Sequence, residues 1–292
     1  MSDNTKSEEP SAAPPRRIGY AIAQELVTRG VRRLILVAQT EDKLQEAAKT
    51  IQATTQNLEI KIITINLGEQ GAPAKIYKQI KEEFNWKVDL LVNNAGFGRK
   101  FVFAEDPETD TSLKTVDLMV RAIVDMMLQF LPDMVSRKSG GILNIGSTGG
   151  FQPVPYTAAY AASKAFVHTF SQAIRQENID KGVRVACVIP GVTETNLDGQ
   201  GHGEKRGIIE KVGVDQPQDV AKVAVDTLED NAAARIVGWN NKAFHSVFNL
   251  EDNAAARIVG WNNKAFHSVF NLLPDSVIAS LVARSRGAPG EE

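Results

Sequence analysis

Short apolar segments alternate with amphipathic ones along most of the chain, and this alternation constrains the fold more than any other feature. The expected strands are Leu34–Ala38, Ile60–Ile65, Val88–Val92, Gly141–Ile145, Val183–Ile189 and Arg235–Val237. The expected helices are Ile18–Arg29, Glu41–Gln52, Ala74–Phe84, a long helix within Thr111–Ser136, another within Thr157–Asp180, and Pro217–Leu228. Apolar strands alternating with helices are typical of a parallel sheet covered on both faces. The sequence therefore predicts a single Rossmann-like, doubly wound α/β domain that binds ligands at the carboxyl ends of its strands.

The amino-terminal end of this pattern is irregular. Ile18–Arg29 reads as an amphipathic helix, but no strand-like segment comes before it. Residues 1–17 are polar and rich in proline, and they have no apolar stretch of the kind found in a signal peptide. We expect residues 1–17 and 287–292 to be disordered tails and residues 18–286 to form the domain.

An exact internal repeat lies near the other end of the chain. Leu228–Asn249 is repeated letter for letter as Leu250–Asn271. Natural repeat folds diverge between units and usually need at least three of them to bury a core. Two identical copies indicate a recent duplication or an error in gene prediction or assembly, and we favour the error. One copy then completes the fold and the other is an insertion.

Composition narrows the class of protein. The chain has 292 residues and a formal net charge of -2, so its overall charge does not favour nucleic acid or an anionic membrane. The single cysteine, Cys187, excludes an intrachain disulfide and suggests a reducing compartment, which we take to be the cytoplasm. No stretch reaches the ~18 apolar residues of a transmembrane helix, and no histidine has the spacing of a metal ligand, so we expect no metal site.

Three residues form a candidate catalytic set. Tyr160 and Lys164 are four residues apart on an expected helix, which places both side chains on one face. An ammonium near a phenol favours the phenolate, and the phenol can then act as acid or base on a carbonyl–alcohol pair. Ser147 follows the strand Gly141–Ile145 and could bond the same substrate oxygen. Taken alone, Tyr160 and Lys164 read better as an ordinary pair on a helix surface, because this spacing is common, and Ser147 could be a turn residue.

Two further motifs follow expected strands. Asn93-Asn94-Ala95-Gly96 comes after Val88–Val92, and Pro190-Gly191-Val192-Thr193-Glu194-Thr195 comes after Val183–Ile189. Each could be a plain turn. Together with the candidate catalytic set, and in this order at successive strand ends, the two motifs form a highly specific sequence signature.

The chain resembles the short-chain dehydrogenase/reductase family, most strongly over residues 141–195. The resemblance implies an oxidoreductase that interconverts a carbonyl and a secondary alcohol with a nicotinamide cofactor and acts as a homodimer or homotetramer. It implies that Ser147 orients the carbonyl, Tyr160 is the acid or base, and Lys164 holds the nicotinamide ribose. The cofactor-binding residues it implies are Gly19, Asn66, Asn93, Ala95, Gly96, Tyr160, Lys164, Pro190, Gly191 and Thr195.

The chain departs from this family at two places. The family begins with a strand and a glycine-rich loop that approaches the pyrophosphate, and only Gly19 of that motif remains here. Loss of the strand would remove a central member of the sheet and leave its neighbours with unpaired backbone groups. The family also places an asparagine in the helix before Leu131, where one register puts Asp117 and a second, which we prefer, puts Met119.

The second expected strand of the family pattern ends at Val37-Ala38-Gln39-Thr40, without the carboxylate that usually binds the ribose of NAD. This favours NADP, although NAD stays open. The sequence thus indicates an NADP(H)-linked oxidoreductase acting on a small-molecule carbonyl or alcohol. Two alternatives stay open: an inactive relative kept as a dimerisation or regulatory partner, and a misassembled version of an active enzyme.

Overall fold

A computed structural model describes residues 17–106, 108, 110–151, 153–191, 193 and 215–237. Of the expected disordered tails, residues 1–17 and 287–292, all but Arg17 lie outside these ranges, as does most of the repeat. The domain boundaries at residues 18 and 286 therefore stay predictions.

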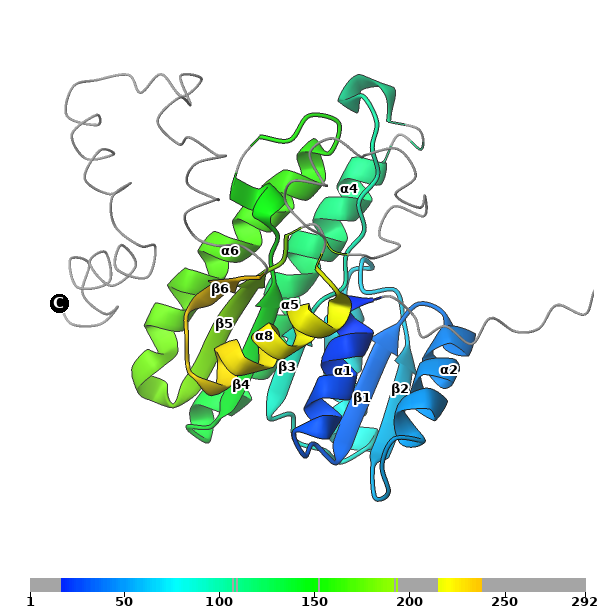
Figure 1. The fold of residues 1–292 in the computed structure, drawn as a ribbon, viewed down its shortest axis with the longest axis vertical. Helices are drawn as coiled ribbons and strands as arrows, with labels where there is room; N and C mark the ends of the chain where they lie inside the picture. The colour runs from blue at the N-terminus through cyan, green and yellow to red at the C-terminus, as the bar shows by residue number, and fades with distance from the viewer. Residues whose placement is uncertain are drawn as a thin grey trace, which may run out of the picture.

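Helices and parallel strands alternate along the described chain, as predicted (Figure 1). The strands are β1 Arg33–Ala38, β2 Glu59–Thr64, β3 Leu90–Asn93, β4 Gly140–Ile145, β5 Val183–Ile189 and β6 Ala234–Ile236. The helices are α1 Ile18–Thr28, α2 Glu41–Gln52, α3 Ala72–Lys78, α4 Thr111–Val116, α5 Ala122–Ser136, α6 Ala158–Asn178 and α8 Pro217–Glu229. Every predicted helix and strand is present, with ends shifted by a few residues at most.

Two of the predicted helices contain a wider π-helical turn. α3 continues into η1, Gln79–Glu83, and the long helix at residues 111–136 is α4 and α5 joined by η3, Asp117–Arg121. The sequence predicts the length of these helices but not the change in winding. Met119 lies in η3 and is fully buried, whereas Asp117 is partly exposed and pairs with Arg121 at 2.8 Å. Met119, rather than Asp117, therefore faces the interior, as in the register we preferred.

The strands form two separate parallel sheets. Among the described strands, β1 pairs only with β2, whereas β3, β4, β5 and β6 form a second sheet in that order. No backbone ladder joins β1 to β3 in the described part of the chain. The loss of a central strand was expected to leave unpaired neighbours, and the divided sheet confirms this expectation.

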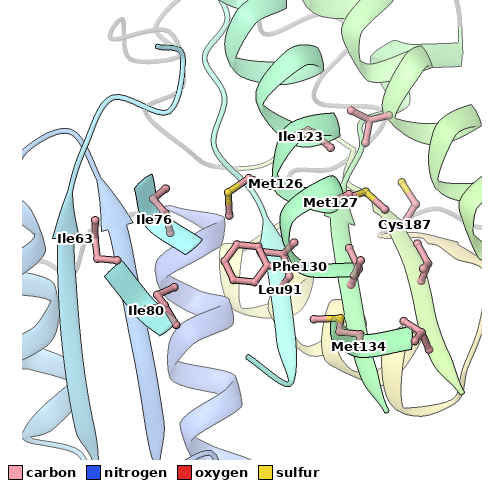
Figure 2. Close-up of a cluster of buried hydrophobic side chains, with 14 of the residues drawn as sticks. Ile63, Ile76, Ile80, Leu91, Ile123, Met126, Met127, Phe130, Met134 and Cys187 are labelled. Carbon is pink, nitrogen blue, oxygen red and sulfur yellow. The ribbon is translucent and has the colours of Figure 1, made fainter. Parts of the chain in front are cut away.

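Helices cover both faces of the two sheets. α1 and α8 pack together over β4 and β5, and α2 extends this layer over β1 and β2. The opposite layer contains α3, η1, α5 and α6, with a core that includes Ile76, Ile80, Phe130 and Leu91 (Figure 2). Cys187 is buried in this core as a free thiol, in agreement with its apolar sequence context.

The loops after β1, β3, β4 and β5 all line one large cavity. Parallel strands bring their carboxyl ends to one edge, so this placement follows from the topology. The candidate site lies here.

Candidate active site

Ser147 lies just after β4, where the strand gives way to the short helix η4, Thr148–Phe151. Its Oγ accepts a 3.1 Å hydrogen bond from the backbone N–H of Gly149, which fixes the side chain at the start of this turn. The hydroxyl lines the cavity. Because the oxygen is held as an acceptor, its hydrogen can be offered to an oxygen in the cavity.

Tyr160 and Lys164 lie one turn apart in α6, and both line the same cavity as Ser147. The ammonium Nζ of Lys164 is 5.8 Å from the centre of the Tyr160 ring. Nζ also donates a 2.7 Å hydrogen bond to the carbonyl oxygen of Ile145, the last residue of β4. The strand end therefore sets the position of the lysine relative to the tyrosine.

Lys164 is buried, with only 6% of its surface exposed. Burial disfavours its charged form and lowers the pKa of the ammonium to about 8. Among the described residues, no carboxylate offsets this loss of solvation, and the hydrogen bond described for Nζ is the one to the carbonyl of Ile145. A buried lysine with a lowered pKa beside a tyrosine is typical of a functional site.

In the Asn93–Gly96 segment, the first residue holds two strands of the sheet together and the next three line the cavity. Asn93 is buried and donates from Nδ2 to Oδ1 of Asn144 at 2.8 Å, so it ties β3 to β4. Asn94, Ala95 and Gly96 follow it along the cavity wall. A Cβ at Gly96 would lie 3.3 Å from Sδ of Met119, so the missing side chain admits the methionine.

Gly19 lies at the start of α1 and lines the cavity opposite this segment. A Cβ at Gly19 would lie 2.6 Å from Nδ2 of Asn94, closer than real Cβ atoms come to other heavy atoms. Glycine therefore lets the first turn of α1 approach the loop after β3. That turn presents backbone N–H groups and the positive end of the helix dipole to the cavity, which together favour an anion.

The other predicted cofactor-binding residues do not all line the cavity. Pro190 and Gly191 line the cavity, and the carbonyl of Pro190 accepts a 3.0 Å hydrogen bond from the N–H of Thr148. Asn66 is not among the lining residues: its Oδ1 accepts from Nε2 of Gln39 at 2.7 Å and from the N–H of Gly68 at 3.0 Å. Thr195 lies outside the described residues.

Two basic residues next to the starts of α1 and α2 also line the cavity. One is Arg17, which directly precedes α1. Lys43, in the first turn of α2, also lines the cavity and was missed. Its signal was present in the sequence, because a cation in the first turn after a strand end lies at the ligand-binding edge of such a sheet.

The described residues contain no group of three or more His, Cys, Asp or Glu side chains that could hold a metal ion. None of their helices combines the length and the apolar character needed to cross a membrane.

Comparison with known proteins agrees with this geometry. Residues 15–205 match the family model for short chain dehydrogenases. An uncharacterized oxidoreductase of Staphylococcus saprophyticus is 30% identical over 212 residues, which cover 73% of this chain and 86% of the relative. The very-long-chain 3-oxoacyl-CoA reductase of Rattus norvegicus is 35% identical over 184 residues, and the match spans 62% of this chain but only 57% of that enzyme.

Solved structures share the fold. A 7beta-hydroxysteroid dehydrogenase superposes with a TM-score of 0.70 at 20% identity, covering 81% of this chain and 88% of the other. A metagenomic short-chain oxidoreductase in complex with NADP superposes with a TM-score of 0.63 at 25% identity, covering 76% and 91%. On the family match, the relatives and the shared fold, this chain belongs to the short-chain dehydrogenase/reductase family of oxidoreductases.

Proposed function

We propose that this chain interconverts a carbonyl and a secondary alcohol by hydride transfer with NADP(H). The observation that carries the proposal is the meeting of Ser147, Tyr160 and Lys164 in one cavity at the carboxyl ends of β3, β4 and β5. A hydroxyl, a phenol and a buried ammonium are what a carbonyl needs for orientation and proton transfer.

Each side chain has a distinct part in this proposal. Ser147 would donate a hydrogen bond to the substrate oxygen, with its own oxygen held by the N–H of Gly149. Tyr160 would give the proton to that oxygen in reduction and take it back in oxidation. Lys164 would favour loss of the phenolic proton through its nearby positive charge. Bound NADPH would supply the hydride, so these residues need only bind, orient and move one proton.

Residues that could bind each half of a dinucleotide line the cavity. Lys164 and Pro190-Gly191 lie where the nicotinamide half would be held, and the first turn of α1 offers N–H groups to a phosphate. Gln39 and Thr40 follow β1 without a carboxylate, while Arg17 and Lys43 supply positive charge nearby. A cation there would favour the extra phosphate of NADP over the free ribose hydroxyl of NAD.

Relatives suggest the first substrate to try. The mammalian relatives are named very-long-chain 3-oxoacyl-CoA reductases, and a short-chain dehydrogenase from Sphingobium yanoikuyae has been solved with NADPH. We therefore propose a 3-oxoacyl thioester as the first carbonyl substrate to assay with NADPH.

The test compares two tyrosine variants of the full chain. Tyr160→Phe should lower kcat by at least about a thousandfold and leave thermal unfolding within a few degrees of wild type, because only the proton donor is lost. Tyr156→Phe removes the same hydroxyl from an exposed residue, 63% accessible, and should leave kcat unchanged. Full activity in Tyr160→Phe would exclude this assignment.

A second candidate function follows from the divided sheet. A relative that has lost the strand between β1 and β3 could serve as a non-catalytic partner that dimerises through the α4–α5 and α6 helices. Titration with NADPH, followed by nicotinamide fluorescence, separates the two candidates. Binding at micromolar NADPH favours the enzyme, whereas no binding at millimolar NADPH favours the partner.

A further inference from the structure

Three side chains recur at four-residue intervals along α6: Tyr160, Lys164 and His168. This spacing places them on one side of the helix, one turn after another. The first two belong to the candidate catalytic set, whereas His168 has no part in the proposed reaction. Its imidazole contacts the ring of Phe151, with the ring centres 5.1 Å apart and the ring planes at 77°. The side of α6 that carries the candidate acid or base therefore continues into an aromatic contact.

Phe151 is the last residue of the short helix η4, which begins directly after Ser147. Gly149, in the same helix, lies beside both hydroxyl-bearing residues of the candidate site. An ideal Cβ at Gly149 would lie 3.5 Å from Oγ of Ser147 and 3.8 Å from Cε1 of Tyr160. Because the N–H of Gly149 also donates to Oγ of Ser147, a shift of η4 relative to α6 would change the separation of the serine and tyrosine hydroxyls.

Backbone contacts hold the first part of η4. The N–H of Thr148 donates a 3.0 Å hydrogen bond to the carbonyl of Pro190, and the N–H of Gly150 donates one of 3.0 Å to the carbonyl of Ser147. An ideal Cβ at Gly150 would lie 2.7 Å from the backbone N of Ala165, so the helix η4 rests directly on the backbone of α6 at this point.

Side chains make the contact with α6 at the carboxyl end of η4. The rings of Phe151 and His168 meet edge to face, an arrangement in which the positive edge of one ring approaches the negative face of the other. η4 is a 3₁₀ helix of four residues, and such short helices have few and poorly aligned hydrogen bonds of their own. α6 has 21 residues and a full set of backbone hydrogen bonds. Loss of the ring contact should therefore loosen η4 and leave α6 in place.

We propose that His168 is a positioning residue, which holds η4 against α6 through Phe151 and so sets Ser147 relative to Tyr160. His168 is not among the residues that line the cavity, so it acts through Phe151 rather than by touching a ligand. The ring of His168 carries this role, and its polar atoms do not. The effect on catalysis rests on the proposed function, whereas the effect on η4 does not.

Hydrogen–deuterium exchange on the full chain, without cofactor, tests the effect on η4. His168→Phe keeps a ring opposite Phe151, whereas His168→Gln keeps a polar side chain and loses the ring. His168→Gln should speed exchange at residues 148–150, whose N–H groups are hydrogen-bonded, by about three- to tenfold. His168→Phe should exchange like the wild type at these residues, and residues 160–164 of α6 should be unchanged in both variants.

Steady-state kinetics with NADPH and a 3-oxoacyl thioester test the effect on catalysis. His168→Gln should lower kcat by about tenfold, because a small displacement of a group in the site is costly. The Kd for NADPH should stay the same, and His168→Phe should restore kcat to within about twofold of wild type. Thr169→Gln, at the exposed neighbouring position of α6, introduces the same side chain away from Phe151 and should leave both kcat and exchange unchanged.

Unchanged exchange at residues 148–150 in His168→Gln would overturn the proposal. Faster exchange or an equal loss of kcat in His168→Phe would also overturn it, because the ring would then not be what holds η4. Full activity in His168→Gln would exclude the effect on catalysis. A wild-type chain without turnover would contradict the proposed function, and the exchange experiment alone would then decide whether His168 holds η4.

Discussion

Asn93 and Asn144 face each other in register across β3 and β4, and Nδ2 of Asn93 donates a 2.8 Å hydrogen bond to Oδ1 of Asn144. The hydrogen-bond network continues to α6, because Nδ2 of Asn144 donates a 2.8 Å hydrogen bond to Oγ of Ser171. Ser171 in turn donates to the carbonyl of Val167 at 2.6 Å. The first asparagine of the motif after β3 is therefore joined to the helix that carries Tyr160 and Lys164.

This buried chain of hydrogen bonds predicts strong coupling between Asn144 and Ser171. Asn144→Ala should lower the free energy of unfolding by about 2–4 kcal/mol, because it removes the buried acceptor of Asn93 and the buried donor to Oγ of Ser171. Ser171→Ala removes one partner and should cost about 1–2 kcal/mol. Urea denaturation of both single variants and the double variant measures the coupling, which we expect to be at least about 0.5 kcal/mol. Strictly additive losses would show that the two side chains act independently.

Lys164 should give the protein a distinctive dependence of stability on pH. Burial lowers the pKa of this ammonium from 10.5 to about 8, so between these values the unfolded chain binds more protons than the folded one. Stability should therefore rise with pH across this window as the cost of burying the charge is relieved.

The stability of Lys164→Met should lack this rise. Relative to the variant, the wild type should gain on the order of 2–3 kcal/mol between pH 8 and pH 10.5, measured by urea denaturation at each pH. Lys181→Met, at an exposed lysine, controls for the loss of one lysine. A constant difference between wild type and Lys164→Met would mean that the buried ammonium is not destabilised.

Gly149 and Gly150 should respond very differently to alanine. A Cβ at Gly150 would lie 2.7 Å from the backbone N of Ala165 and the backbone C of Lys164, and a helix backbone cannot easily move away. Gly150→Ala should therefore cost about 1–3 kcal/mol of stability and displace Lys164. A Cβ at Gly149 would come no closer than 3.5 Å to its nearest neighbour, so Gly149→Ala should change stability by less than about 0.5 kcal/mol. Thermal unfolding of the two variants checks the contrast.

Arg29 should stabilise the contact between α1 and α8. Its guanidinium pairs with Glu25 at 2.8 Å and with Asp226 and Glu229 of α8, both at 2.6 Å. Arg29→Ala should lower the midpoint of urea denaturation at low salt, and lower it by less in 1 M salt, because exposed ion pairs are screened. Lys78→Ala removes a single exposed pair with Glu82 and should have an effect near zero. Equal effects of the two changes at low salt would argue against a special role for Arg29.

Much of the fold could be predicted from the sequence, because helices and strands leave local patterns of apolar and polar residues. The apolar run Val183–Ile189 and the helix Glu41–Gln52 were predicted with the ends that the structure gives them. The sequence also predicts that no strand precedes Ile18, but residues 1–16 lie outside the part of the chain that the structure describes. The catalytic set and the loops after β3 and β5 were named from residue type and spacing, and the topology brings their described residues to one cavity. Asn66, which follows β2 and was named from the family resemblance, does not line it.

Only the tertiary structure decided features that depend on contacts between distant residues. The sequence cannot show that Ile145 fixes the ammonium of Lys164, or that Asn93 is turned into the sheet toward Asn144, because these pairs are 19 and 51 residues apart. Nor can it show that β1 and β3 belong to separate sheets in the described part of the chain, with both strands lining one cavity. Sequence determined the elements and the chemical groups, since both arise from local patterns. Packing determined which groups face the cavity, which are buried in the sheet, and where the sheet remains open.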